Sequence, residues 1–270
     1  MAIITISRGS YSKGKEVAEM VADQLGYNCI SREVLLDASE HFNIPEIKLV
    51  HAIHDAPSIL DRFNHKKEVF IAYIRSALVQ RVKNDNVVYH GLAGHLLLTG
   101  ISTVLKARIT AKLEDRVTAE MQRKSITREK ARELLLKDDL ERRKWTKSLY
   151  GVDPWDSSLY DITIRIGKLT VNDAVNFICQ AATQDQFKPS DTSRRKLEDL
   201  AIACRIKSAL VMQFPDVGVK CDYGNVIIYI KGDERSVKNI KKKVIPLKEE
   251  MEGINNLEIH AGTHYPPDTV

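Results

Sequence analysis

The sequence predicts an α/β protein with a mainly parallel five-stranded sheet, helices on both of its faces, a helical lid and a small α+β unit at the C-terminal end. Three observations predict this fold. Short β-branched runs alternate with longer stretches of helical periodicity over residues 1–183. The first run leads through a loop with two glycines into a helix. After a polar stretch that contains Pro189, the pattern changes to two strands between two helices.

The chain has 270 residues, enough for one α/β core and a small extra module. Its composition, 43% hydrophobic and 29% charged, is typical of a globular protein in water. The formal charge of 41 − 36 = +5 favours anionic ligands such as nucleotides. That charge is too small and too dispersed to predict a nucleic-acid partner.

Sequence features favour a cytoplasmic location. The four cysteines, Cys29, Cys179, Cys204 and Cys221, are far apart and form no Cys-x-x-Cys pair, which argues against a zinc ribbon or a disulfide framework. The chain starts directly with a strand pattern and has no apolar run near the roughly 20 residues that span a bilayer. We therefore expect a cytoplasmic protein that is not transmembrane.

The first strand, loop and helix cover residues 3–25. The spacing Gly9-x-x-x-x-Gly14-Lys15 matches a Walker A loop, in which backbone N–H groups surround a phosphate and a lysine reaches its outer oxygens. Glu16 stands where that motif has a serine or threonine for magnesium. An ordinary strand-to-helix turn is the alternative. The predicted phosphate-binding residues of this glycine loop (residues 9–16) are Gly9, Ser10, Tyr11, Ser12, Lys13, Gly14, Lys15 and Glu16.

The remaining elements of the first unit follow in order. Strands are predicted at 27–31, 86–91, 102–110 and 158–168, and helices at 32–42, 45–56, 66–83, 95–100, 112–125, 128–151 and 171–182. Thr127 is a predicted N-cap, and Thr170 with Asp173 forms a capping box. His51 and His54 have the spacing of a metal pair, but no third ligand is near, so no metal site is predicted.

Several helices carry arginines that could meet an anionic ligand. Arg75 and Arg81 lie on the helix over 66–83, where plain surface exposure is the alternative. Arg116 and Arg123 are seven residues apart, on one face of the helix over 112–125. The charge-dense helix over 128–151 is either a salt-bridged surface or a mobile flap that closes over phosphates.

The C-terminal part divides into a linker at 184–192, an α+β unit at 193–262 and a loose tail at 263–270. Its predicted elements are a helix at 194–214, two strands within 217–232 that turn at Gly224-Asn225, a basic helix at 236–251 and a strand at 256–261.

Residues 1–183 resemble the cytidylate kinase-like branch of the P-loop nucleoside monophosphate kinases. The opening "ITISR" and the basic residue followed by glutamate at 15–16 are similar to that branch. The end of the lid is also similar to that branch, through Asp139, Glu141, Arg142, Trp145, Tyr150, Gly151, Asp153, Trp155 and Ser158-Leu-Tyr-Asp161. The resemblance implies that the glycine loop binds ATP phosphates with Mg²⁺, that Lys15 and Arg142 are catalytic, and that Arg116 and Arg123 support them.

One position departs from the family pattern. The third strand is expected to end in Gly-Arg, where the arginine serves the acceptor nucleotide, but this chain has Gly91-Leu92. Leucine cannot bind a phosphate, which leaves the acceptor open. Arg32, Arg75 and Arg81 are candidate replacements, and the sequence does not choose among them.

The C-terminal unit resembles a BON-type module through Gly224, Gly232 and Gly253. Lys238, Lys241 and Lys242 lie near one helix face that could contact anionic groups, a protein or an anionic surface, or could simply be solvated. The unit is expected to act as a regulatory or oligomerising appendage. The leading hypothesis is an ATP-dependent phosphotransferase. The alternative is a regulatory protein that binds nucleotides without turnover and recruits a partner through its C-terminal module.

Overall fold

The computed structural model describes residues 2–31, 33–43, 66–84, 86–231, 234–262, 265–266 and 269–270. Arg32 and the predicted helix over 45–56, with His51 and His54, lie outside the described residues.

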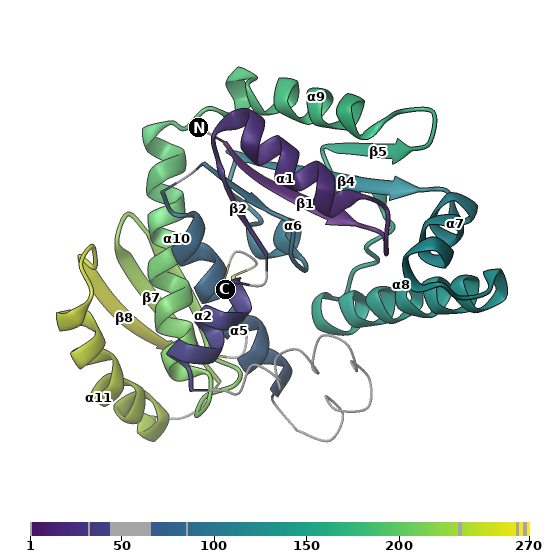
Figure 1. Ribbon diagram of the computed structural model, residues 1–270. Coiled ribbons are helices and arrows are strands. Elements are labelled where there is room, and N and C mark those ends of the chain that lie inside the picture. Colours follow the sequence, from purple (N-terminus) through teal and green to yellow (C-terminus); the bar gives the residue numbers. More distant parts are fainter. Residues whose placement is uncertain are drawn as a thin grey trace.

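The predicted five-stranded sheet is confirmed. All its pairings are parallel, in the order β2-β3-β1-β4-β5 (Figure 1). The central strand β1 is buried on both faces, which explains why it reads as a nearly continuous apolar run. The strands are β1 Ile3–Arg8, β2 Asn28–Ile30, β3 Val87–Tyr89, β4 Val104–Ala111 and β5 Ile162–Ile166.

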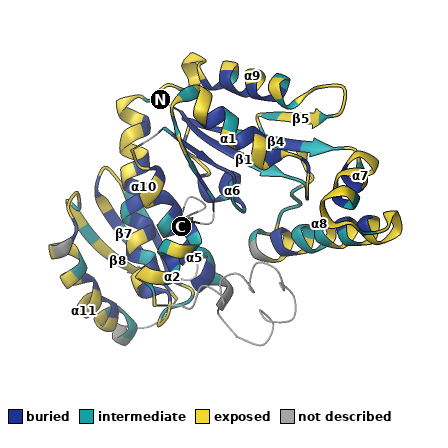
Figure 2. Cartoon of the chain, in the orientation of Figure 1, coloured by how far each residue is buried: buried dark blue, intermediate teal, exposed yellow. Residues whose placement is uncertain are grey.

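Helices cover both faces of this sheet, as predicted. Ile4 and Ile6 of β1 pack with α1 and α9, whereas Ile3 faces a core built with α2, α5 and α6. The buried sides of these helices turn toward the sheet in Figure 2. The helices of this unit are α1 Gly14–Leu25, α2 Glu33–His41, α5 Lys66–Val82, α6 Gly94–Leu97, α7 Leu113–Lys124, α8 Arg128–Tyr150 and α9 Val171–Ala182.

Two helix starts follow the predicted capping chemistry. The Thr127 side chain accepts a hydrogen bond from the Lys130 N–H at 3.3 Å, which caps α8. Thr170 and Asp173 form the predicted capping box of α9. Both motifs satisfy N–H groups that the first helical turn leaves without a partner.

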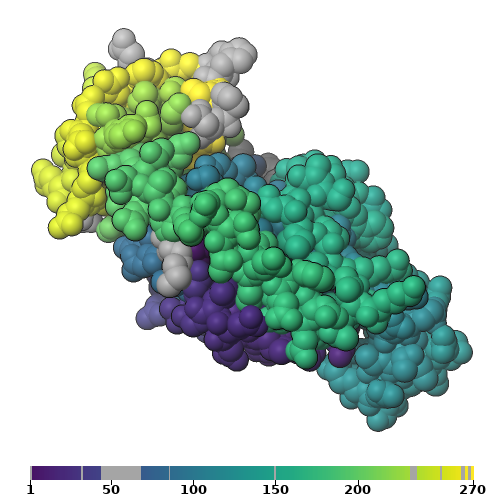
Figure 3. All heavy atoms as spheres, turned by 90° about the horizontal axis from the view of Figure 1, so that it is seen from above, coloured from purple at the N-terminus to yellow at the C-terminus, as the bar shows by residue number. Residues whose placement is uncertain are grey.

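The helices α7 and α8 form a lid beside the carboxyl end of the sheet, at the end of the molecule opposite to the C-terminal unit (Figures 1 and 3). Val117, Ala131 and Leu135 pack the two helices together. Trp145, near the end of α8, is 1% exposed and belongs to the core that contains Ile74 of α5. The far end of α8 is therefore anchored in the main core, because a buried tryptophan contributes a large apolar area.

The small C-terminal α+β unit is also confirmed. Strands β6 and β7 are antiparallel, and β7 pairs with β8 in parallel. The turn falls at Tyr223 and Gly224, with φ of 50° and 72°, one residue earlier than predicted, because Asn225 already pairs with Asp222. The elements are α10 Asp191–Leu210, β6 Gly218–Asp222, β7 Asn225–Ile230, α11 Glu234–Glu250 and β8 Asn256–Ala261.

Helix α10 takes part in both cores. It starts at Asp191, three residues before the predicted start, because Ser190 caps it by accepting a hydrogen bond from the Ser193 N–H. Leu197 and Cys204 pack in the main core, and Ile206 packs in the core of the C-terminal unit. The boundaries at 183 and 193 stay predictions.

The expectation of a loose tail is wrong for Val270. Its N–H donates to the Val219 carbonyl at 2.9 Å, and the Val219 N–H donates to the Val270 carbonyl at 3.2 Å. β6 is an edge strand of its sheet, so one row of its backbone groups is open to such pairing. Within the described part of the chain, no helix has the length and apolar character to cross a membrane.

Candidate functional site

The glycine loop is held in shape by contacts within the protein. Tyr11 and Lys13 adopt left-handed backbone conformations with φ of 55° and 63°. The Ser12 hydroxyl is buried and lies 3.0 Å from both the Gly9 carbonyl and the Ile109 carbonyl. The second of these contacts ties the loop to β4. A loop held in this way is preorganised, since binding does not have to order it.

The two motif glycines have different surroundings. A Cβ on Gly14 would lie 2.5 Å from the Arg8 Cβ, closer than two carbon atoms can approach. A Cβ on Gly9 would meet no atom closer than 3.8 Å. Gly14 therefore allows the start of α1 to pass tightly over the end of β1, whereas Gly9 leaves open space beside Arg116.

Lys15 and Glu16 lie on the first turn of α1. The Lys15 Nζ is 3.5 Å from Glu19 Oε1, and its side chain is 63% exposed. Glu16 faces Lys13 at 3.9 Å. Neither residue lines the cavity described next. A catalytic role for Lys15 stays a prediction, and it requires the flexible side chain to turn away from Glu19.

A cavity of about 440 Å³ opens at the carboxyl ends of β1, β3 and β4, between the sheet and the lid. Open parallel sheets bind ligands at this edge. We call it the arginine cavity, because four arginines line it together with Gly9 and Asp139. The four are Arg8, Arg108, Arg142 and Arg143.

Three of these arginines have no acidic partner among the described residues. Arg143 forms an ion pair with Asp153 and lies 4.3 Å above the ring of Trp155. In contrast, no such pair involves Arg8, Arg108 or Arg142 in the described chain. Burial, and then the charge of Arg142, lower the pKa of Arg8. Partly buried cations without counterions attract anions, and guanidinium groups bind phosphate in a bidentate manner.

Other residues that line the arginine cavity are less charged. Leu92 lines it, and the Leu92 carbonyl accepts a hydrogen bond from the Tyr89 hydroxyl at 3.1 Å. His90 and His95 also line it and are 7% and 4% exposed. His90 Nδ1 and His95 Nε2 are buried and have no hydrogen-bond partner among the described residues. These residues therefore offer apolar contact and two unused polar atoms.

His95 is held as a neutral imidazole. Burial first, and then the nearby Lys106 and Arg108, lower its pKa to about 4. Its ring lies 4.7 Å from the ring of Tyr160. The Tyr160 hydroxyl is hydrogen-bonded to the Pro154 carbonyl at 2.9 Å and to Ser7 Oγ at 3.2 Å. This cluster links β1, α6 and the segment after the lid.

Both helices of the lid, α7 and α8, contact the glycine loop. Arg116 of α7 donates to the Ser10 carbonyl and to Asp139 Oδ2, each at 2.8 Å. The Ser10 N–H donates to Asp139 Oδ1 of α8 at 3.1 Å. Arg123 lies 4.9 Å above the Tyr11 ring and donates to its hydroxyl at 3.3 Å.

Arg123 is also paired with Glu120, a carboxylate that is only 1% exposed and that Lys124 contacts as well. The pairing with Arg123 is the largest cause of the lowered pKa of Glu120. Arg123 is therefore held over Tyr11 by its own helix.

The predicted site residues fall into three groups. Arg142 lines the arginine cavity, and Arg116 and Arg123 contact the glycine loop. Arg75 lies elsewhere, because its Nε donates to the Leu97 carbonyl at 2.9 Å. Arg81 also lies elsewhere, paired with Asp37 of α2 through a 2.7 Å hydrogen bond. Arg32 is outside the described residues.

The sequence patterns single out neither Arg8 nor Arg108 as site residues, and they include Arg143 only among the many charges of the helix over 128–151. Arg8 is the last residue of β1, and Arg108 pairs with the neighbouring Ser7 in the sheet register. A signal for both existed, because each arginine lies toward the carboxyl end of a predicted strand. Arg143 gave no separate signal of a site role, because it is one of many charged residues on α8. Among the described residues, no group of three or more potential metal ligands is found.

The comparison with protein families gives a clear match. Residues 3–168 match the model of the cytidylate kinase-like family. The chain belongs to the cytidylate kinase-like family.

Individual relatives are more distant. A cytidylate kinase from Methanocaldococcus jannaschii is 31% identical over 105 residues, which cover 38% of this chain and 59% of that protein. The chain thus spans about three fifths of the length of this curated relative.

Solved structures match the first unit at low identity. An uncharacterized protein from Eubacterium ventriosum aligns with a TM-score of 0.52 and 20% identity, over 67% of this chain and 97% of that chain. This likeness concerns the fold alone. A shikimate kinase from Bacteroides thetaiotaomicron aligns with a TM-score of 0.41 and 8% identity, over 68% of this chain and 99% of its own. That TM-score is too low to carry an argument.

Proposed function

We propose that this protein is an ATP-dependent phosphotransferase that acts on a small anionic acceptor, as nucleoside monophosphate kinases do. The observation that carries the proposal is the set of three arginines, Arg8, Arg108 and Arg142, that share one cavity beside the glycine loop without acidic partners among the described residues. Membership of the cytidylate kinase-like family supports a kinase-type reaction.

In this proposal the loop amides surround the donor phosphates. Lys15 leaves Glu19 and reaches the outer phosphates, since its side chain is 63% exposed and is not packed against the protein. Arg142 and Arg8 stabilise the charge of the transferring phosphoryl group. Mg²⁺, when bound, would neutralise phosphate charge and would be held largely by phosphate oxygens and water. The unpaired arginines and the preorganised loop suit a polyphosphate of this kind.

The acceptor is the open part of the proposal. Leu92 presents an apolar side chain to the cavity, and Arg75 and Arg81 are engaged outside it. We therefore propose Arg108, rather than either of these, as a contact for the acceptor's anionic group. The candidate acceptors are CMP, the other nucleoside monophosphates and other small phosphorylated molecules.

We also propose that the protein is cytoplasmic, that its C-terminal unit is a BON-type module and that the protein forms a homo-oligomer. The order α10-β6-β7-α11-β8 supports this assignment. Lys238, Lys241 and Lys242 of α11 are exposed, so they are available to a protein partner or an anionic surface. The alternative of a regulatory protein without turnover gains no support from the site or from the comparisons.

The test is turnover with purified full-length protein, Mg²⁺, ATP and a panel of nucleoside monophosphates, followed as ADP release. We expect turnover with at least one acceptor. Arg142→Ala should lower kcat by about 10²- to 10³-fold, the usual loss when a transition-state charge contact is removed. Lys15→Ala should weaken ATP binding.

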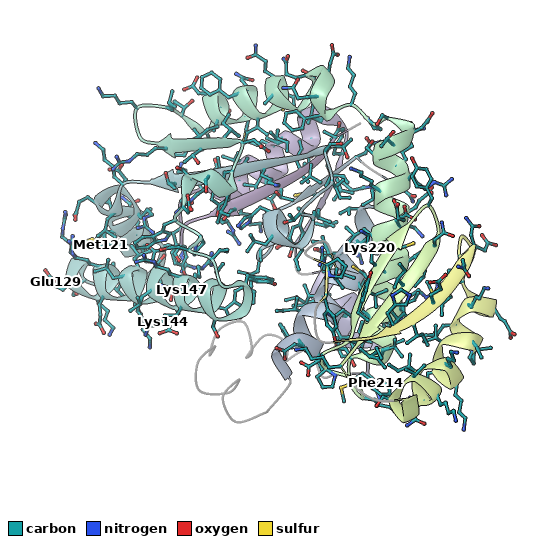
Figure 4. All side chains as sticks on the ribbon, turned by 180° about the vertical axis from the view of Figure 1, so that it is seen from behind. Met121, Glu129, Lys144, Lys147, Phe214 and Lys220 are labelled. Atoms are coloured by element: carbon teal, nitrogen blue, oxygen red, sulfur yellow. The ribbon has the colours of Figure 1, made fainter. Side chains whose placement is uncertain are left out.

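Lys147→Ala is the matched control. Lys147 is exposed on the same helix, where Figure 4 labels it, and does not line the arginine cavity. It should keep full activity. The proposal fails if no monophosphate is phosphorylated and Lys15→Ala leaves ATP binding unchanged. ATP binding without turnover on the whole panel would support the regulatory alternative instead.

A further inference from the structure

A carboxylate from the lid occupies a hydrogen-bonding position on the glycine loop. Asp139 of α8 accepts the Ser10 N–H at 3.1 Å through one oxygen. Its other oxygen accepts from the Arg116 guanidinium at 2.8 Å, and the same guanidinium donates to the Ser10 carbonyl at 2.8 Å. The Asp139 side chain is only 16% exposed and that of Arg116 is 10% exposed. The contact is therefore largely shielded from water, where an ion pair is screened less than at the surface.

The groups around this carboxylate are those that bind an anion. A backbone N–H and a guanidinium are common donors to phosphate oxygens. Two more polar atoms at the same place, Ser10 Oγ and Arg116 Nε, are buried and have no hydrogen-bond partner in the described part of the chain. Ser10 is 1% exposed, so water does not easily satisfy its hydroxyl. A carboxylate thus leaves part of the hydrogen-bonding capacity of this position unused, and a phosphoryl group has more oxygens and more charge to fill it.

We propose that Asp139 is a latch that holds the lid on the glycine loop and that a nucleotide phosphate displaces it by binding to Ser10 and Arg116. This inference rests on the proposed function, because it concerns the regulation of the same site.

The latch also connects the loop to the arginine cavity. Arg142 follows Asp139 by three residues on α8, which places the two side chains on the same side of the helix. Both line the cavity. When Asp139 leaves Ser10, the part of α8 before the anchored Trp145 loses a contact to the loop, and the side chain of Arg142 on the same side of the helix can change its position. Donor binding at the loop therefore affects the position of the arginine that stabilises the transferring phosphoryl group.

The experiment compares ATP binding by the full-length protein, Asp139→Asn and Asp138→Asn, measured by calorimetry at one ionic strength. Asparagine keeps the shape and one acceptor oxygen but removes the charge. We expect Asp139→Asn to bind ATP at least fivefold more tightly, because the competing carboxylate is weakened. Asp138→Asn is the matched control: it removes the same charge one residue away, outside the cavity lining, and should change the affinity less than twofold. Equal or weaker ATP binding by Asp139→Asn would overturn the proposal.

A second measurement tests the latch without any ligand. Hydrogen–deuterium exchange of the loop peptide that covers residues 9–16 is compared between Asp139→Ala and Asp138→Ala. Loss of the latch should speed exchange in Asp139→Ala alone, since the Ser10 N–H loses its acceptor. Equal exchange in the two variants would refute the latch. If none of the proteins binds ATP but exchange changes as expected, the proposed function fails and the latch stands as a lid contact.

Discussion

Gly14→Ala tests whether the motif glycine is required by packing rather than by ligand binding. The new Cβ would lie 2.5 Å from the Arg8 Cβ and 3.1 Å from its Cδ. Carbon atoms normally approach to about 3.5–4.0 Å, so the start of α1 and the end of β1 must separate by about 1 Å. A rotamer change cannot move the Arg8 Cβ, because it is attached to a central strand that pairs on both sides.

Overpacking of this kind costs about 1–3 kcal/mol. Alanine also favours helix over glycine by up to about 1 kcal/mol, but Gly14 is the first residue of α1 and gains only part of this. We therefore expect Gly14→Ala to lower the free energy of unfolding by about 1–2 kcal/mol. Arg8 lines the arginine cavity, so the displacement should weaken ligand binding as well.

The assay is urea unfolding followed by tryptophan fluorescence, with Gly9→Ala as the matched control. A Cβ on Gly9 meets nothing closer than 3.8 Å, so this variant should stay within about 0.5 kcal/mol of the parent protein. An unchanged urea dependence of the unfolding free energy would show that both variants start from the same compact state. If Gly14→Ala is as stable as the parent protein, or Gly9→Ala costs as much, the packing argument is refuted.

Two further predictions concern the lid anchor and the buried histidine. Trp145→Ala should lower the free energy of unfolding by about 3–5 kcal/mol, because the Trp145 side chain is 1% exposed. Trp145→Phe should lower this free energy clearly less. Equal decreases for the two variants, measured by urea unfolding, would contradict the prediction. His95 has a pKa of about 4 in the folded protein, below its ordinary value of 6.5. Between pH 6.5 and pH 4 the unfolded chain therefore binds a proton at His95 that the folded protein does not bind, and stability falls as the pH falls. Between pH 7 and pH 5 this group should remove about 2 kcal/mol of stability, and His95→Gln should flatten that part of the pH profile measured by urea unfolding. An equal slope in His95→Gln would assign the effect to other groups.

The contrast between Arg142 and Arg75 shows what kind of site information a sequence contains. The family resemblance of the lid implies a role for Arg142, and Arg142 lines the arginine cavity. Arg75 is a predicted candidate because it lies on a long buried helix, but its Nε donates a hydrogen bond to the Leu97 carbonyl. Helical periodicity tells which residues share a face, and it does not tell what that face packs against. The choice among Arg32, Arg75 and Arg81 therefore could not be made from sequence.

The sequence by itself determined the elements and their order. β-branched runs, helical periodicity and the caps at Thr127 and Thr170 act over a few neighbouring residues, so they predicted the strands, most helix starts and the class of fold. Even Glu16, unusual for the loop motif, was informative as part of a local pattern that the family match supports.

Only the tertiary structure decided which distant residues meet. Arg8 and Arg142, and likewise Ser10 and Asp139, are separated by more than a hundred positions, and their contacts depend on how the lid lies against the sheet. α10 joins two cores for the same reason, since it packs with α5 on one side and β6 on the other. Such long-range contacts are set by packing and electrostatics of the whole chain, and no short stretch of sequence encodes them.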